Sequence, residues 1–157
     1  MQTHSSEYTC KIIGPADVEE YKKVIELRQA FVELGDAPEH LHLDDDKCDI
    51  YLLYKGDEPV ATARTHYTPS KGYKLQRFAV LASNRSKGYG RTIMDEILRR
   101  LLPILKPGEQ ITLSSRFSRI SFYERCGFQI CGDFILEFGV PCRPMAYPLN
   151  KAPMQKL

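Results

Sequence analysis

The chain has 157 residues, of which 43% are hydrophobic and 27% charged, and its formal net charge is +2. This size fits one domain, and the composition is that of a folded globular protein rather than a disordered or fibrous chain. A charge so close to neutral argues against nucleic acid or an anionic membrane surface as the partner. We therefore expect a single domain over residues 1–157, with no nucleic-acid or membrane partner.

The N-terminal residues and the cysteines bear on location. The first ten residues are polar and lack an apolar signal region, and no stretch is long enough to cross a bilayer. The five cysteines contain no Cys-x-x-Cys pair, which favours reduced thiols over a disulfide framework or a zinc ribbon. We expect a cytoplasmic protein, with a nuclear location as an alternative.

The first half of the chain reads as one helix followed by strands. A strand is expected over residues 8–13, and Asp17 is a candidate N-cap for an amphipathic helix that ends near Gly35. Residues 36–47 are polar and rich in turn formers, so we expect a solvated loop or short helical turn there. The strand-like runs that follow cover residues 48–55, 59–67 and 73–82, and Gly56 lies in a hairpin connection between the first two.

The second half begins with the clearest helical pattern. Its apolar face is formed by Ile93, Met94, Ile97, Leu98, Leu101 and Leu102. The remaining segments are expected to be a strand over 109–114, a short helix over 117–126, and strands over 128–138 and 142–147. This order of elements, without a repeat of fixed period, predicts a mixed α/β fold.

A glycine-containing turn precedes that helix. Arg85-Ser86-Lys87-Gly88-Tyr89-Gly90 lies between a predicted strand and the helix, an arrangement that directs backbone N–H groups and the positive end of the helix dipole at an anion. Gly88 and Gly90 allow the backbone to approach a pyrophosphate closely, and Arg85, Lys87 and Arg91 add positive charge. The alternative is a solvated basic turn, because six residues form a short pattern.

Two motifs together resemble the GNAT superfamily of N-acetyltransferases. The first is Arg-x-x-Gly-x-Gly at 85–90, preceded by Phe78-Ala79-Val80, and the second is the run from Phe122 to Phe128, FYERCGF. Finer similarities to the ElaA-like branch are RQAFV at 28–32, LDDD at 43–46, Ala63-Arg64 and EFGVP at 137–141. Cys142 departs from that branch, whose members usually have a histidine there, so the role of that histidine is not transferred.

The resemblance implies a mixed, mostly antiparallel central sheet flanked by helices, and acetyl-CoA as the co-substrate. In the superfamily the pantetheine arm lies against the fourth strand, which implies contacts from Phe78, Ala79 and Val80. The pyrophosphate would then lie on Arg85, Ser86, Lys87, Gly88, Tyr89, Gly90 and Arg91. Backbone N–H groups of the fourth strand can stabilise the developing oxyanion.

Tyr123 is the candidate catalytic residue, because the family places a tyrosine there beside the cofactor sulfur, where it can give a proton to the departing thiolate. A half-buried structural tyrosine is the alternative. The general base stays open among His66, Asp46, Glu137 and a water chain. His40 and His42 beside residues 44–46 also suggest a metal site, but a solvated loop is the better interpretation, and we expect no metal.

Arginines from several predicted elements are candidates for acceptor binding. If they face the acceptor, they favour an amine that also carries phosphate or carboxylate. These residues are Arg28, Arg64, Arg77 and Arg116. The predicted function is acetyl transfer from acetyl-CoA to a small-molecule amine by direct attack, with glucosamine 6-phosphate as the specific guess. The alternatives are another small amine, a protein amino group, a non-catalytic acyl-CoA-binding module, or a nucleic-acid module using residues 85–100; relatives commonly form homodimers.

Overall fold

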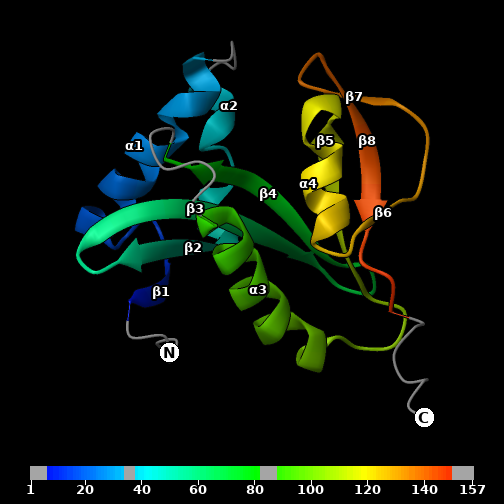
Figure 1. The fold of residues 1–157 in the computed structure, drawn as a ribbon, viewed down its shortest axis with the longest axis horizontal. Helices are drawn as coiled ribbons and strands as arrows, with labels where there is room; N and C mark the ends of the chain where they lie inside the picture. The colour runs from blue at the N-terminus through cyan, green and yellow to red at the C-terminus, as the bar shows by residue number, and fades with distance from the viewer. Residues whose placement is uncertain (1–6, 34–37, 82–87, 150–157) are drawn as a thin grey trace. The chain divides into compact units, whose positions relative to one another are not determined.

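The computed structural model describes residues 7–33, 38–81 and 88–149. Its helices are α1 (Val18–Glu33), α2 (Pro38–Leu41), α3 (Tyr89–Leu101) and α4 (Ile120–Arg125). Its strands are β1 (Tyr8–Ile13), β2 (Cys48–Lys55), β3 (Glu58–Thr68), β4 (Gly72–Val80), β5 (Gln110–Arg116), β6 (Gln129–Ile130), β7 (Ile135–Glu137) and β8 (Val140–Ala146). Figure 1 shows these elements along the chain.

The strands pair in the order β1-β2-β3-β4-β5-β8-β6, and β7 also pairs with β8. β4 and β5 run parallel, whereas β1–β2, β2–β3, β5–β8, β6–β8 and β7–β8 are antiparallel. The predicted mixed α/β class with a mostly antiparallel sheet is therefore confirmed. The β4–β5 register runs from Gly72↔Gln110 to Leu75↔Leu113, although β4 continues to Val80 and β5 to Arg116.

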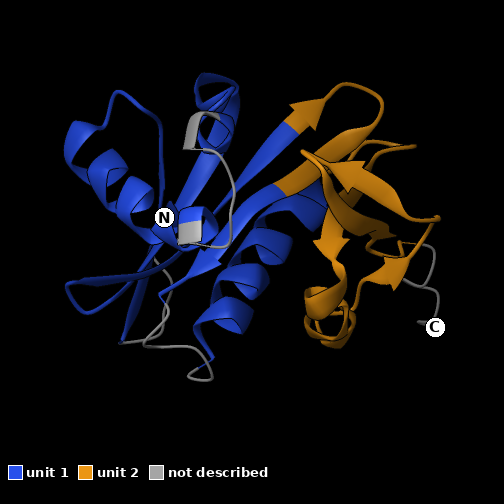
Figure 2. Ribbon diagram, turned by 90° about the horizontal axis from the view of Figure 1, so that it is seen from above, with its two compact units in different colours: residues 1–66, 76–104 blue, residues 67–75, 105–157 orange. Residues whose placement is uncertain are grey.

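The described residues group into two compact units, coloured separately in Figure 2. Unit 1 contains residues up to 66 together with 76–104, and unit 2 contains 67–75 and the residues from 105 onward. The chain passes from one unit to the other within β3, within β4 and again after Ile104. The expected single domain over residues 1–157 stays a prediction.

In unit 1, β2 is buried on both faces. Ile50 and Leu52 alternate along the strand and pack against Val24 and Leu27 of α1, in one apolar cluster. Tyr51 and Leu53 point to the other face and are also buried, which explains the continuous buried run along β2. Five residues of the expected apolar face of α3 are buried: Ile93, Met94, Ile97, Leu98 and Leu101. Leu102 lies beyond the helix, and Tyr89 is buried as well.

In unit 2, one glycine allows close contact between two strands. Gly72 has a φ of 110°, and a Cβ placed on it would lie 2.1 Å from the backbone oxygen of Gln110. The parallel β4–β5 pair therefore needs glycine at the start of β4.

The strand expected over residues 128–138 is interrupted. It forms only the short strands β6 and β7 beside β8, because the intervening backbone makes other contacts. The carbonyl oxygen of Gly132 accepts a hydrogen bond from the side-chain Nε of Arg143 at 2.9 Å. A Cβ on Gly132 would also lie 2.7 Å from Cγ of Pro144. Glycine at 132 thus permits a turn packed against the proline, which a regular strand would not allow.

Candidate functional site

Residues 85–91 form the predicted pyrophosphate-binding turn, called here the phosphate cradle, and the structure describes it from Gly88 onward. Arg85, Ser86 and Lys87 lie outside the described residues. Gly88 has φ 84° and ψ 5° and is the N-cap of α3, and its carbonyl oxygen accepts a hydrogen bond from the Thr92 backbone at 3.0 Å. The first turn of α3 contains no acidic residue. The positive end of the helix dipole is therefore not neutralised by a carboxylate of that turn.

The other cradle residues differ in exposure. Tyr89 is buried, and its ring packs edge-on against Tyr8 with 6.1 Å between centroids, so its side chain belongs to the core of unit 1. Arg91 is exposed and its Nε lies 3.1 Å from Oδ1 of Asp95. An exposed pair of this kind contributes little free energy to the folded state.

The backbone of β4 is irregular where the cofactor is predicted to bind. Arg77 lies in the middle of the strand with a φ of 55°, a left-handed conformation that side chains other than Gly, Asn and Asp rarely adopt. Phe78 and Val80 follow it and are half-buried, whereas Ala79 is buried. The left-handed residue turns the peptide groups of β4 away from the directions that a regular strand would give them.

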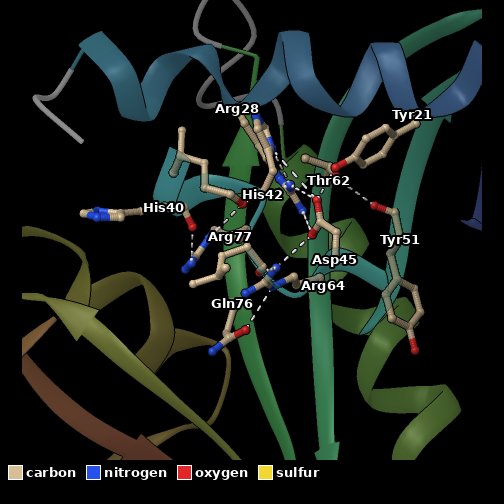
Figure 3. Close-up of polar contacts among 12 residues, drawn as sticks. Tyr21, Arg28, His40, His42, Asp45, Tyr51, Thr62, Arg64, Gln76 and Arg77 are labelled. Carbon is tan, nitrogen blue, oxygen red and sulfur yellow. Dashed lines mark hydrogen bonds and ion pairs between the residues drawn. The ribbon is translucent and has the colours of Figure 1, made fainter. Parts of the chain in front are cut away.

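Asp45 is the centre of a buried polar cluster in unit 1 (Figure 3). Its carboxylate accepts hydrogen bonds from Arg28 Nη1 at 2.7 Å and Nη2 at 3.1 Å, from Arg64 Nη1 at 2.8 Å, and from the Tyr21 hydroxyl at 2.6 Å. Burial opposes ionisation of Asp45, but the hydrogen bonds from Arg28 and Tyr21 outweigh it and hold the pKa of Asp45 below its ordinary value. The carboxylate is therefore charged at neutral pH.

The cluster also fixes the charge states of Tyr21 and His42. Burial and the hydrogen bond to Asp45 raise the pKa of Tyr21 to about 12, so the phenol stays protonated. Burial and the charge of Arg28 lower the pKa of His42. The Nδ1 atom of His42 lies 3.0 Å from Nη1 of Arg28, which fits a neutral imidazole that accepts a hydrogen bond.

Three of the four predicted acceptor-binding arginines lie in or beside this cluster. Arg28 and Arg64 are 0% and 2% exposed, so their observed contacts are internal. Arg77 donates from Nη2 to the carbonyl oxygen of His40 at 2.9 Å and from Nε to that of Leu41 at 3.2 Å. These contacts favour a structural role for the three side chains. Whether any of them touches an acceptor stays a prediction.

The fourth arginine and the predicted acid belong to unit 2. Arg116 ends β5 and is half-buried, in register with Cys142 of β8. Tyr123 of α4 is partly buried, with ring centroids 5.2 Å from Phe122 and 6.3 Å from Phe128. Burial raises the pKa of Tyr123 well above its ordinary value, so the phenol remains protonated and can donate a hydrogen bond at physiological pH.

The cysteine thiols near Tyr123 are buried. Cys126 and Cys142 are 6% and 3% exposed, and both are free thiols. Phe128 is likewise buried, as expected of a core residue, whereas Phe122 is only partly buried.

The candidate bases differ in their surroundings. Oε2 of Glu137 lies 3.3 Å from Nζ of Lys74 and 3.4 Å from Oγ of Ser114. His66 is half-buried on β3, and Asp46 is exposed. The geometry does not select one of them, so the base stays open.

The expected solvated loop at 36–47 is wrong for Asp45, which is 2% exposed. Helical turns at Pro38–Leu41 and Asp45–Lys47 bring its carboxylate under α1, where the arginines outweigh its tendency to face water. The contact between the Tyr21 hydroxyl and Asp45 was not predicted from sequence. The available signal was that the ElaA-like similarities at Arg28, Asp45 and Arg64 fall on residues that now contact one another.

The described residues contain neither a metal-binding cluster nor a membrane-spanning helix. Within residues 7–33, 38–81 and 88–149, no group of three or more His, Cys, Asp or Glu side chains is placed to hold a metal ion. In the same ranges, no helix combines the length and apolar character needed to span a membrane.

Comparison with known proteins assigns the family. Residues 46–130 match the acetyltransferase (GNAT) domain. The N-acetyltransferase YjcF of Bacillus subtilis is 26% identical over 135 residues, which cover 83% of this chain and 94% of YjcF. Because the matched domain spans more than half of the sequence, the chain belongs to the GNAT acetyltransferase family. It is an acetyl-CoA-dependent N-acetyltransferase.

Solved structures agree on the fold. Escherichia coli ElaA superposes with a TM-score of 0.76 and 22% identity, covering 90% of this chain and 99% of ElaA. An aminoglycoside 6'-N-acetyltransferase complexed with coenzyme A superposes with a TM-score of 0.67 and 16% identity, covering 87% of this chain and 94% of that protein. At these identities the structures support the fold, and they do not identify the acceptor.

Proposed function

We propose that this enzyme transfers acetyl directly to the primary amine of a small molecule that also carries a phosphate or carboxylate, with glucosamine 6-phosphate as the specific candidate. The observation behind this acceptor class is a charge imbalance in unit 1. Two buried guanidiniums, of Arg28 and Arg64, face one buried carboxylate, of Asp45. The surplus of positive over negative side chains in this cluster supports an anionic acceptor over a polyamine, because buried charges are weakly screened.

For the cofactor, we assign the pyrophosphate of acetyl-CoA to the start of α3. The left-handed Gly88 and the absence of acidic residues in the first turn of α3 support this assignment. The proposed pyrophosphate contacts are Arg85, Ser86, Lys87, Gly88, Tyr89, Gly90 and Arg91. Since the Tyr89 ring is buried, its share is a backbone contact. Phe78, Ala79 and Val80 of β4 are assigned to the pantetheine arm.

In the proposed reaction, a neutral amine attacks the thioester carbonyl, the oxyanion is stabilised by N–H groups of β4, and the C–S bond then breaks. Tyr123 is assigned to the departing sulfur. Its raised pKa makes full proton transfer to a thiolate unfavourable, because the conjugate thiol has a pKa near 8.5. Tyr123 therefore acts mainly by a hydrogen bond that strengthens as negative charge develops on sulfur. The proton that the attacking nitrogen loses, as the tetrahedral intermediate collapses to the amide, balances the thiolate as free CoA thiol.

We place the enzyme in the cytoplasm and propose a homodimer. Five free cysteines, at positions 10, 48, 126, 131 and 142, fit a reducing compartment. Unit 2 exposes several large apolar side chains of the kind found at subunit contacts: Phe117, Ile130, Phe134, Leu136 and Phe138. Light scattering across a concentration series measures the oligomeric state, and a monomer at all concentrations removes the dimer from the proposal.

The acceptor is tested by release of free CoA thiol from acetyl-CoA with matched amines. Glucosamine and glucosamine 6-phosphate differ only in the phosphate, and spermidine, amino acids and short peptides complete the panel. We expect kcat/KM to be highest for the phosphorylated sugar, and the advantage to shrink with added salt. Equal kcat/KM for the two sugars, or a preference for spermidine, rejects the anionic acceptor class while leaving acetyl transfer intact.

A further inference from the structure

Three arginines from three elements of unit 1 hold the carbonyl oxygens of one short segment, residues 40–43. Arg28 of α1 donates to the carbonyl of Leu41 at 3.1 Å, and Arg64 of β3 donates to that of Leu43 at 2.6 Å. Arg77 of β4 donates to the carbonyls of both His40 and Leu41. We call these three side chains, with the Asp45 carboxylate, the arginine clamp; Figure 3 shows them converging on the segment.

The clamp is a rigid arrangement. Each of the three side chains donates at least two hydrogen bonds. Arg64 also donates from Nε to Oε1 of Gln76 at 2.9 Å, next to Arg77 in β4. A planar guanidinium presents its donors in a fixed fork, so these contacts fix directions as well as distances. Lysine has one donor centre and cannot reproduce the two carbonyl contacts of Arg77 in the same geometry.

Backbone strain coincides with the clamp. Asp44 has a φ of 67° and Arg77 a φ of 55°. Aspartate tolerates this conformation, whereas for a long side chain within a strand it is unfavourable. Such conformations persist where surrounding contacts hold them, and they concentrate at functional sites.

We propose that Arg77 is a positioning residue: its side chain, anchored on residues 40–41, maintains the left-handed turn in β4 and so orients the β4 peptide groups that meet acetyl-CoA. This inference rests on the proposed function for its catalytic consequence. It reassigns Arg77 from binding the acceptor to shaping the strand. The local order of residues 38–45 is therefore coupled to that of residues 76–80, because the Arg77 guanidinium joins the two segments.

The test compares substitutions that differ in their tolerance of a positive φ. Arg77→Ala loses the side-chain contacts and also disfavours the left-handed backbone, whereas Arg77→Gly and Arg77→Asn lose the contacts but accept that backbone. Arg77→Lys keeps the charge without the fork. Lys22→Ala, at an exposed position of α1, is the matched control.

For Arg77→Ala we expect CoA affinity in calorimetry to fall on the order of tenfold, and kcat to fall for anionic and neutral amines alike. Arg77→Gly and Arg77→Asn should recover most of the CoA affinity, within about threefold of the parent. All four Arg77 variants should exchange backbone amides of residues 38–45 faster than the parent, and Lys22→Ala should not. Measurements are made well below each variant's unfolding temperature.

Several results overturn the inference. If Arg77→Gly and Arg77→Asn lose as much CoA affinity as Arg77→Ala, then Arg77 does not maintain the backbone conformation. If only the KM of anionic amines rises, Arg77 binds the acceptor. If backbone amide exchange in residues 38–45 is the same in the Arg77 variants as in the parent, Arg77 does not hold this segment. If the parent enzyme binds no CoA, the proposed function and the cofactor consequence fail together, while the exchange comparison still decides whether Arg77 couples the two segments.

Discussion

Arg28 and Asp45 form a two-point ion pair in which both groups are removed from water. The distances are 2.7 Å from Nη1 to Oδ2 and 3.1 Å from Nη2 to Oδ1, and the side chains are 0% and 3% exposed. Parallel hydrogen bonds of this kind are strong and directional. Removing either partner leaves a buried charge with fewer partners, which is the more costly event.

Arg28→Met is therefore expected to reduce the free energy of unfolding by about 3–5 kcal/mol. Arg28→Lys should lose less, because it keeps the charge but not the second hydrogen bond. Lys22→Met breaks an exposed pair with Glu19 and should change stability by less than about 1 kcal/mol. Urea unfolding followed by circular dichroism gives all three values. Equal losses for Arg28→Met and Lys22→Met would contradict the buried pair.

Asp45 predicts a loss of stability at acid pH. Its pKa is lower in the folded state, so the unfolded chain takes up protons first as pH falls. The stabilisation is complete above the unfolded pKa, near 3.9, and is lost as pH falls through the lower folded value. Urea unfolding from pH 6 to pH 2 should show a steeper decline in the parent than in Asp45→Asn. Parallel curves would show that Asp45 does not carry the effect.

We expect His42 to cause a second loss of stability, at a higher pH than the loss caused by Asp45. Its folded pKa lies below the ordinary value, so its contribution is present above about pH 6.5 and is lost as pH falls further. In His42→Gln, the dependence of unfolding free energy on pH should flatten between about pH 7 and pH 5. The change should leave the decline below pH 4 intact, since that part belongs to carboxylates. A parent profile that is flat in this window rules out the proposed neutral His42.

Substitutions of Gly88 distinguish the effect of backbone strain from that of repulsion between the side chain and the ligand. Its φ is 84° and a Cβ there would meet nothing within 4 Å, so Gly88→Ala introduces conformational strain only, of about 1–2 kcal/mol. Gly88→Asn should be milder, because asparagine tolerates the left-handed conformation. Gly88→Glu adds bulk and negative charge and should abolish CoA binding in calorimetry. If all three variants bind CoA as the parent does, the proposed pyrophosphate site is elsewhere.

Tyr123→Phe removes the proposed hydrogen bond to the thiolate while keeping the ring packed between Phe122 and Phe128. We expect kcat to fall about 10²–10³-fold with little change in CoA affinity. Because burial raises the pKa of Tyr123, its ionisation should produce no decline in parent activity up to about pH 10. Steady-state kinetics across pH provide both readouts. Equal turnover in parent and variant would exclude Tyr123 from the reaction.

Local patterns in the sequence were sufficient for most elements. The strand at 8–13 and the strand at 48–55 have the predicted bounds, and the apolar face of α3 is the predicted one apart from Leu102, which lies beyond the helix. Where the prediction differs, a contact distant in sequence is responsible. The run 128–138 is rich in apolar residues, as a strand often is. Within it, however, the carbonyl oxygen of Gly132 accepts a hydrogen bond from the Arg143 side chain, and Gly132 lies against Pro144.

The candidate site, too, was predictable from sequence only in part. The motif residues around Gly88 and Tyr123 could be proposed from sequence and stay predictions, since a helix-starting glycine and a short motif are local properties. The role of the arginines was not, because Arg28, Arg64 and Arg77 are each typical of a polar surface when considered alone. Their shared contacts with residues 40–45 become visible only when α1, β3 and β4 are placed together.

The sequence by itself determined the order of elements, the amphipathic faces and the family motifs, because periodicity and turn chemistry act within a few residues. Only the tertiary structure decided which polar side chains are removed from water, and therefore that Asp45 is a buried anion and that Arg77 holds a strained strand. Burial and charge pairing depend on segments far apart in the chain, and it is those segments that set the electrostatics of the folded protein.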